Sequence, residues 1–124
     1  MTEASVSELG GYIETIESGY EFLLAYAAQG RQSDKGSAQG QDVREFLKAM
    51  DEALDGFAAA CRNAAESLDG NEISYATFLD AVEKDASIAQ GVIRLVLTRE
   101  NISSQLVDNL NANVHLRTLL TNLF

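Results

Sequence analysis

The stretch LDGNEISYATFL, residues 68–79, decides how this chain of 124 residues folds back on itself. Its central Asp69-Gly70-Asn71 combines residue types that favour turns, and glycine is the commonest residue just beyond a helix end. Ser74 is a suitable N-cap for the apolar residues that follow it. We therefore interpret this stretch as the boundary between two helical hairpins, residues 5–68 and 74–124.

The same stretch superficially resembles the second half of a calcium-binding EF-hand loop. Such a loop needs alternating oxygen ligands, a glycine at its sixth position and a glutamate at its twelfth. If Asp69-Gly70-Asn71 takes positions three to five, Glu72 replaces the glycine; if Ile73 takes position eight, Thr77 replaces the final glutamate. Because neither register supplies the ligands, the sequence predicts a turn here and no calcium site.

Apolar residues spaced alternately by three and four positions predict amphipathic helices on both sides of this boundary. The chain has no proline to interrupt them. Four helices in antiparallel hairpins predict an all-α, four-helix bundle-like fold, with residues 1–124 as a single helical domain. The expected helices cover residues 5–30, 42–68, 74–99 and 102–123. The expected core positions of the second helix are Val43, Leu47, Met50, Leu54, Phe57, Cys61, Ala64 and Leu68.

Several helix boundaries depend on local signals. Residues 31–41, RQSDKGSAQGQ, contain glycines and no large apolar side chain, so we expect a flexible internal loop that ends at an Asp42 cap. The third helix is expected to kink or restart near residues 85–87, where Ser87 begins a capping-box pattern. Asn101 or Ser103 can cap the fourth helix.

The segment from Val92 to Leu97 is apolar on nearly all sides and rich in β-branched residues. Such a run is typical of a strand or of a buried helix. Because the chain offers no convincing second strand, we expect a deeply buried helix here. The last helix carries Asn and Thr on its polar side instead of charged residues, which predicts that another surface covers it.

The charge of the chain limits its partners. The formal net charge is −10, which disfavours binding to nucleic acid and to anionic membrane surfaces. Glu14, Glu17 and Glu21 lie off the apolar stripe of the first helix, where no Lys or Arg accompanies them. We interpret this row as a solvated face that suits another protein with a basic surface.

Residues that could support chemistry are few. Cys61 is the single cysteine and cannot form an intramolecular disulfide, and no basic, apolar secretion signal opens the sequence, so we expect a cytoplasmic location. A reactive pair of Cys61 with His115 is conceivable, but Cys61 falls on the apolar stripe, where a thiol is unreactive. One histidine cannot supply a two-metal bundle site, and residues 36–41 lack the ending of a phosphate loop. No catalytic residue, metal or cofactor is therefore expected, which argues against an enzyme.

Two interpretations of function follow. The preferred one is a small acidic interaction module, an adaptor, regulator or assembly factor that acts as a homodimer through helix surfaces. The alternative is a ligand-binding or catalytic bundle with a small molecule held between its helices. The residues expected at an interface are Tyr12, Tyr26, Leu116, Leu119, Leu123 and Phe124. The residues expected to face an interior ligand are Tyr20, Met50, Phe57 and Phe78.

Overall fold

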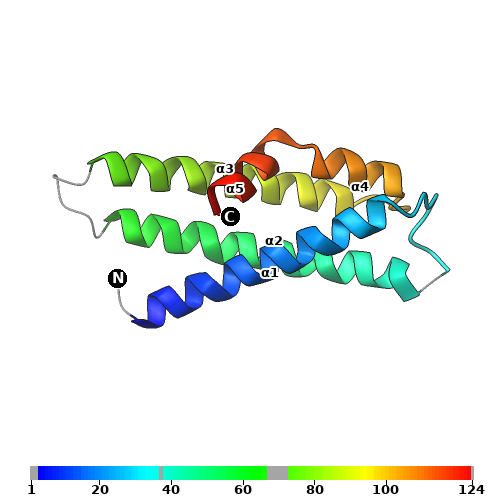
Figure 1. Cartoon of the computed structure of the whole chain (residues 1–124), viewed down its shortest axis with the longest axis horizontal. Coiled ribbons are helices and arrows are strands. Elements are labelled where there is room, and N and C mark those ends of the chain that lie inside the picture. Colours follow the sequence, from blue (N-terminus) through cyan, green and yellow to red (C-terminus); the bar gives the residue numbers. More distant parts are fainter. Residues whose placement is uncertain (1–2, 37, 67–72, 124) are drawn as a thin grey trace.

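The computed structural model describes residues 3–36, 38–66 and 73–123, and all regular secondary structure in these ranges is helical. The second helix runs antiparallel to both the first and the third, while the last two helices share the place of a fourth (Figure 1). The predicted all-α bundle is therefore confirmed. The helices are α1 (Glu3–Ala27), α2 (Ala38–Glu66), α3 (Ile73–Leu97), α4 (Ser104–Asn111) and α5 (Val114–Leu123).

The core follows the apolar stripe of α2, which contacts both α1 and α3. Every predicted core position of α2 from Val43 to Cys61 is buried, and Ala64 is half-buried. Leu68, the last predicted position, lies outside the described residues. The spacing of apolar residues thus correctly predicted which face of α2 turns inward.

Glycines let α1 and α2 approach closely. A Cβ placed on Gly19 of α1 would lie 2.4 Å from the Cγ and Sδ atoms of Met50, which is fully buried. A Cβ on Gly56 of α2 would lie 2.5 Å from the Tyr12 ring. Glycine destabilises a helix interior relative to alanine, but at these two positions the missing Cβ allows the two helices to pack closely.

One expected boundary is wrong, and for α3 one of the two expected alternatives is excluded. α2 begins at Ala38, so Asp42 lies inside the helix and does not cap it. α3 continues from Ile73 to Leu97 without a restart at Ser87, and residues 92–97 belong to this helix and not to a strand. The expected turn at residues 69–71 lies outside the described residues.

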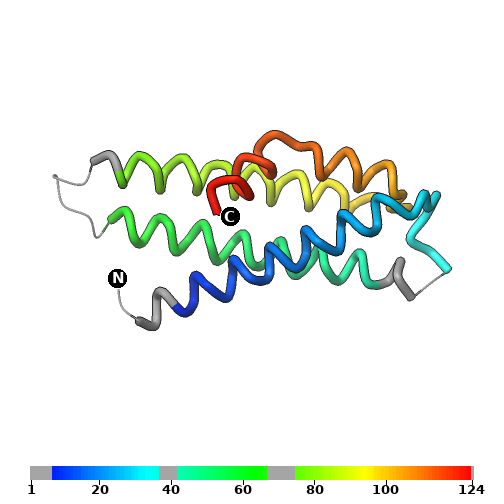
Figure 2. Tube along the Cα trace, in the orientation of Figure 1, coloured from blue at the N-terminus to red at the C-terminus, as the bar shows by residue number. Residues whose placement is uncertain are grey.

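The fourth expected helix is divided into α4 and α5 at Ala112 and Asn113 (Figure 2). The Asn113 side-chain oxygen accepts hydrogen bonds from the backbone N–H groups of His115 and Leu116, each at 3.1 Å. This side chain therefore caps a new helix, because it satisfies N–H groups that have no partner within that helix. Ser103 caps α4 in the same way, as the sequence allowed.

The interruption changes which residues of the last segment face the core. Val114, the first residue of α5, is 66% exposed. Leu116 and Leu119, which were expected at an interface, are fully buried. A continuous helix would have kept the original register, whereas the turn at Asn113 reorients everything that follows it.

One end of the bundle is closed by hydrogen bonds between two loops. The carboxylate of Asp34 accepts from the Arg44 guanidinium and, at 2.7 Å, from the Ile102 N–H. Arg44 also donates to the carbonyl oxygens of Leu97, Arg99 and Glu100 at the end of α3. The expectation of a flexible loop at 31–41 did not anticipate these contacts.

The backbones of the two loops are also joined directly. Arg31 and Ser104 exchange hydrogen bonds, from the Ser104 N–H to the Arg31 carbonyl and from the Arg31 N–H to the Ser104 hydroxyl. The hydroxyl of Tyr26, a fully buried residue, donates to the Ile102 carbonyl at 2.6 Å. Tyr26 is therefore part of the interior, and its assignment to an interface is wrong.

Among the described residues, no helix combines the length and the apolar character that a membrane crossing requires.

Candidate functional site

The seam between α3 and α4 forms an apolar groove on the surface of the bundle. α4 packs mainly against α1 and α5 packs against α3, so α3 and α4 share few contacts. The groove has a volume of about 270 Å³. Its lining residues are Val92, Leu95, Val96, Arg99, Leu106, Asn109 and Leu110.

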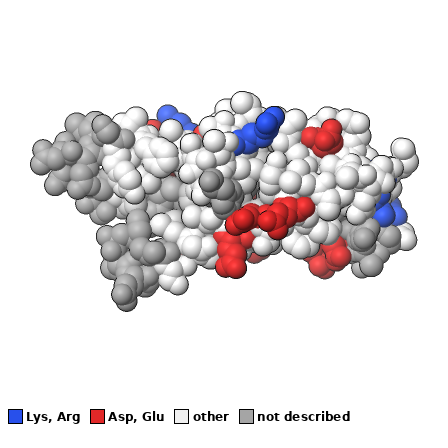
Figure 3. Space-filling model, viewed as in Figure 1, with Lys and Arg blue, Asp and Glu red and all other residues white. Residues whose placement is uncertain are grey.

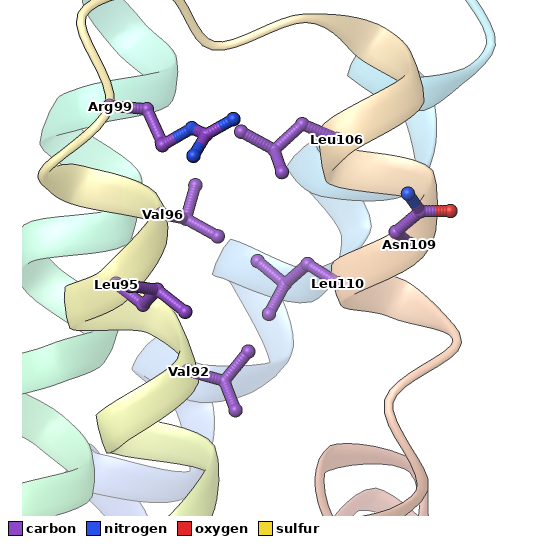
Figure 4. A pocket seen from close by; sticks show the side chains of 7 residues that line it. All are labelled: Val92, Leu95, Val96, Arg99, Leu106, Asn109 and Leu110. Carbon is purple, nitrogen blue, oxygen red and sulfur yellow. The ribbon is translucent and has the colours of Figure 1, made fainter.

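The geometry of the groove is set by side chains that point toward each other from two helices (Figure 4). Val92 and Val96 extend from α3, and Leu106 and Leu110 extend from α4 across the seam. Val96 and Leu110 are buried and form the floor, while Leu95 is 65% exposed at the edge. The exposed Leu95 side chain therefore extends the apolar surface of the recess outward.

Arg99 supplies the positive charge of the groove. Its side chain extends from the end of α3 toward Leu106 (Figure 4). No ion pair joins its guanidinium to any residue in the described ranges. Its backbone, however, is fixed, because the Arg99 carbonyl accepts from Arg44 at 2.8 Å. The groove therefore combines an apolar centre with a positioned, unpaired cation.

Sequence reasoning did not identify this groove, although its signal was present. The run from Val92 to Leu97 was recognised as apolar on nearly all sides and was expected to be deeply buried. The structure buries Ile93 and Val96 but leaves Leu95 exposed. The expectation failed because α4 packs mainly against α1 and leaves the Leu95 side of α3 uncovered.

The residues expected at an interface do not form one surface. Tyr26, Leu116 and Leu119 are fully buried within the chain. Tyr12 is half-buried, and its hydroxyl donates to Glu8 at 2.6 Å. Leu123 packs against the core and is half-buried, while Phe124 lies outside the described residues.

The residues expected to face an interior ligand are also separated. Met50 is fully buried against Gly19, and Tyr20 is half-buried at the edge of the core. Phe57 is buried, whereas Phe78 is 46% exposed and therefore does not belong to the core. Phe57 and Phe78 nevertheless line one common cavity, which lies at the end of the bundle away from the Asp34 contacts.

Chemistry at Cys61 and His115 has little support from their surroundings. Burial is the main cause that raises the pKa of the Cys61 thiol to about 11, with the Glu83 carboxylate adding to it. The Nδ1 atom of His115 lies 3.0 Å from an oxygen of Asp85, which joins α5 to α3. Within the described part of the chain, no hydrogen bond connects Cys61 with His115, and no three metal-ligating side chains cluster.

The acidic row on α1 lies at the surface, as expected. Glu14, Glu17 and Glu21 are exposed, and Figure 3 shows acidic side chains gathered along α1 on the face in view. These carboxylates form no ion pair with a described residue.

No protein-family model matches the chain, and comparisons with curated proteins and with solved structures likewise find no match.

Proposed function

We propose that this protein is an interaction module that binds the helix of a partner protein in the groove between α3 and α4. The observation that carries the proposal is the apolar seam itself, with Leu95 exposed beside it. Two helices form its walls, and a groove of this kind accepts the apolar face of a third helix. The partner helix would cover the seam between α3 and α4.

The charge at the groove indicates the chemistry of the partner. Arg99 has no carboxylate partner among the described residues, and the groove lining contains no acidic side chain. A partner helix with an apolar stripe and one Asp or Glu at its end would pair with Arg99. The net charge of −10 makes a second copy of the chain a poorer occupant, because the two copies repel each other.

The homodimer and the cytoplasmic location remain proposals that rest on the sequence. A homodimer would need a different set of contacts from the predicted one, since Tyr26, Leu116 and Leu119 are buried. The exposed acidic row on α1 would pair with a basic region of the same partner protein. That region would lie outside the helix that enters the groove.

Paired variants test the proposal. Proteins captured from the source cell by the wild-type chain are identified, and the affinity of each purified candidate is then measured by calorimetry. Leu95→Glu should weaken binding at least about tenfold, because it places a charge in an apolar contact. Leu24→Glu is the matched control, since Leu24 is 47% exposed on α1 and outside the groove.

A second pair of variants tests the charge. Arg99→Glu should weaken binding and reduce its dependence on salt, whereas Arg117→Glu, outside the groove, should not. Binding that survives Leu95→Glu and is lost with Leu24→Glu would contradict the proposal. Sedimentation of the chain alone reports in parallel whether the expected homodimer forms.

The alternative function, a bundle that binds a small molecule, is favoured by one observation. The support is that Phe57 and Phe78, two of the four residues expected to face a ligand, line one cavity, whereas Tyr20 and Met50 do not line it.

A further inference from the structure

The cavity at the second end of the bundle is distinct from the groove. It has a volume of about 110 Å³ and shares no residue with the groove. Its walls come from the first half of α1, the second half of α2, the first half of α3 and the end of α5. The lining residues are Leu9, Ile13, Phe57, Ala60, Cys61, Ala64, Tyr75, Phe78, Leu79, Val82, Asn122 and Leu123.

The chemistry of this lining is nearly uniform. None of the described residues that line the cavity is an Asp, Glu, Lys or Arg, although charged residues make up 23% of the chain. The polar groups are the phenol of Tyr75, the amide of Asn122 and the thiol of Cys61. Tyr75 and Asn122 are exposed, so they lie at the mouth, while Phe57, Leu79 and Val82 are buried and form the interior.

The burial of Cys61 is consistent with an apolar interior. Burial raises the pKa of its thiol to about 11, although the nearby Arg62 acts in the opposite direction. The loss of hydration is therefore the largest effect on the pKa of this thiol, which lines the cavity. A charged ligand placed here would lose its hydration with no charged side chain among the described lining residues to replace it, which is unfavourable.

We infer that this cavity is a binding site for a small, uncharged, apolar molecule of the size of a single aromatic ring. The volume supports this class of ligand, because an engineered apolar cavity of about 150 Å³ in another protein stays dry and binds benzene or xenon. The aromatic rings of Phe57 and Phe78 provide faces against which a planar ligand can pack. This inference does not depend on the proposed protein partner, because the two sites share no residue.

Binding in this cavity would also have a structural consequence. The ligand would contact four helices at once, including the end of α5, which otherwise packs mainly on α3. A molecule that binds the folded state alone raises the free energy of unfolding in proportion to the logarithm of its concentration. Ligand binding should therefore raise the melting temperature and hold α5 against α1 and α2.

The experiment is a titration of the full chain with benzene, followed through methyl resonances in NMR spectra. We expect saturable shifts at Leu79, Val82 and Leu123, which line the cavity, and none at Leu95 and Leu106, which line the groove. Benzoate, which has the same ring and a negative charge, should bind at least about tenfold more weakly. No saturable shift at the cavity methyls, or shifts confined to the groove methyls, would overturn the inference.

A cavity-filling variant provides the second test. Ala60→Leu adds three carbon atoms at a residue that lines the cavity, and it should reduce benzene affinity at least about tenfold. Ala81→Leu is the matched control, because Ala81 is exposed on α3 outside the lining, and it should leave affinity unchanged. Unchanged benzene affinity in a folded Ala60→Leu protein would contradict the inference. If that variant does not fold, the comparison of benzene with benzoate on the wild-type chain tests the inference in its place.

Discussion

Asp34 and Arg44 form an ion pair that holds the two loops at one end of the bundle together. The Asp34 side chain is only 6% exposed, and its partner Arg44 is 27% exposed. Through this pair, the start of α2 is connected to the Ile102 N–H and to three carbonyl oxygens at the end of α3. The pair thereby positions Arg99 and the nearby end of the groove.

Removal of either partner of this pair should be strongly destabilising. Asp34→Ala removes the carboxylate that neutralises Arg44 and leaves the Ile102 N–H without its acceptor, so we expect a loss of about 3–5 kcal/mol in the free energy of unfolding. Urea denaturation measures this loss. Lys35→Ala is the control, because the Lys35–Glu100 pair is exposed and should contribute under about 1 kcal/mol.

Stability should fall in acid partly through Asp34. Burial alone would raise the pKa of its carboxyl, but hydrogen bonds from Arg44 and the Ile102 N–H outweigh burial and lower the pKa below the usual 3.8. Because the folded-state pKa is lowered, this stabilisation is present above the unfolded-state pKa and disappears as the pH falls through the folded-state value. We expect the free energy of unfolding of Asp34→Asn to depend less on pH than that of the wild type below about pH 4. Parallel curves for the two proteins would contradict this.

Tyr26→Phe should change stability and leave self-association unaltered. The substitution keeps the buried ring but removes the donor to the Ile102 carbonyl, so a buried acceptor loses its partner. We expect a loss of about 1–2 kcal/mol. Thermal denaturation and sedimentation of the same sample separate this outcome from an interface role, which would change the sedimentation and spare the melting temperature.

The helical glycines should respond to alanine in opposite directions. Gly91→Ala meets no atom within 4 Å and should stabilise the protein by about 0.5–1 kcal/mol, because alanine favours the helix. Gly19→Ala places its Cβ against the buried Met50 side chain and should cost about 1–3 kcal/mol of net stability. Chemical denaturation of both variants gives the comparison. Stabilisation by Gly19→Ala would show that Met50 moves aside freely.

Cys61 should react slowly in the folded protein. With a thiol pKa of about 11, only about one molecule in a thousand carries a thiolate at pH 8. Iodoacetamide should therefore modify the native chain far more slowly than the urea-unfolded chain, as followed by mass spectrometry. Equal rates in the two states would mean that Cys61 is neither buried nor perturbed.

The sequence by itself determined the fold class and the inward face of α2. Both depend on local periodicity, because side chains three and four positions apart share one side of a helix wherever that helix later packs. The absence of proline and the Ser103 cap are equally local signals. The exposed position of Glu14, Glu17 and Glu21 followed from the same pattern.

Tertiary structure alone decided which residues form the candidate sites. The cap at Asn113 redirects α5, and this buries Leu116 and Leu119 and exposes Val114. The seam beside Leu95 stays open because α4 packs mainly on α1. Asn113 is a common cap residue, so the signal existed, but the choice to end a helix there depends on what the two shorter helices can pack against. Burial of Tyr26, and the meeting of Phe57 with Phe78 at one cavity, likewise require contacts between segments that are distant in sequence, which periodicity does not encode.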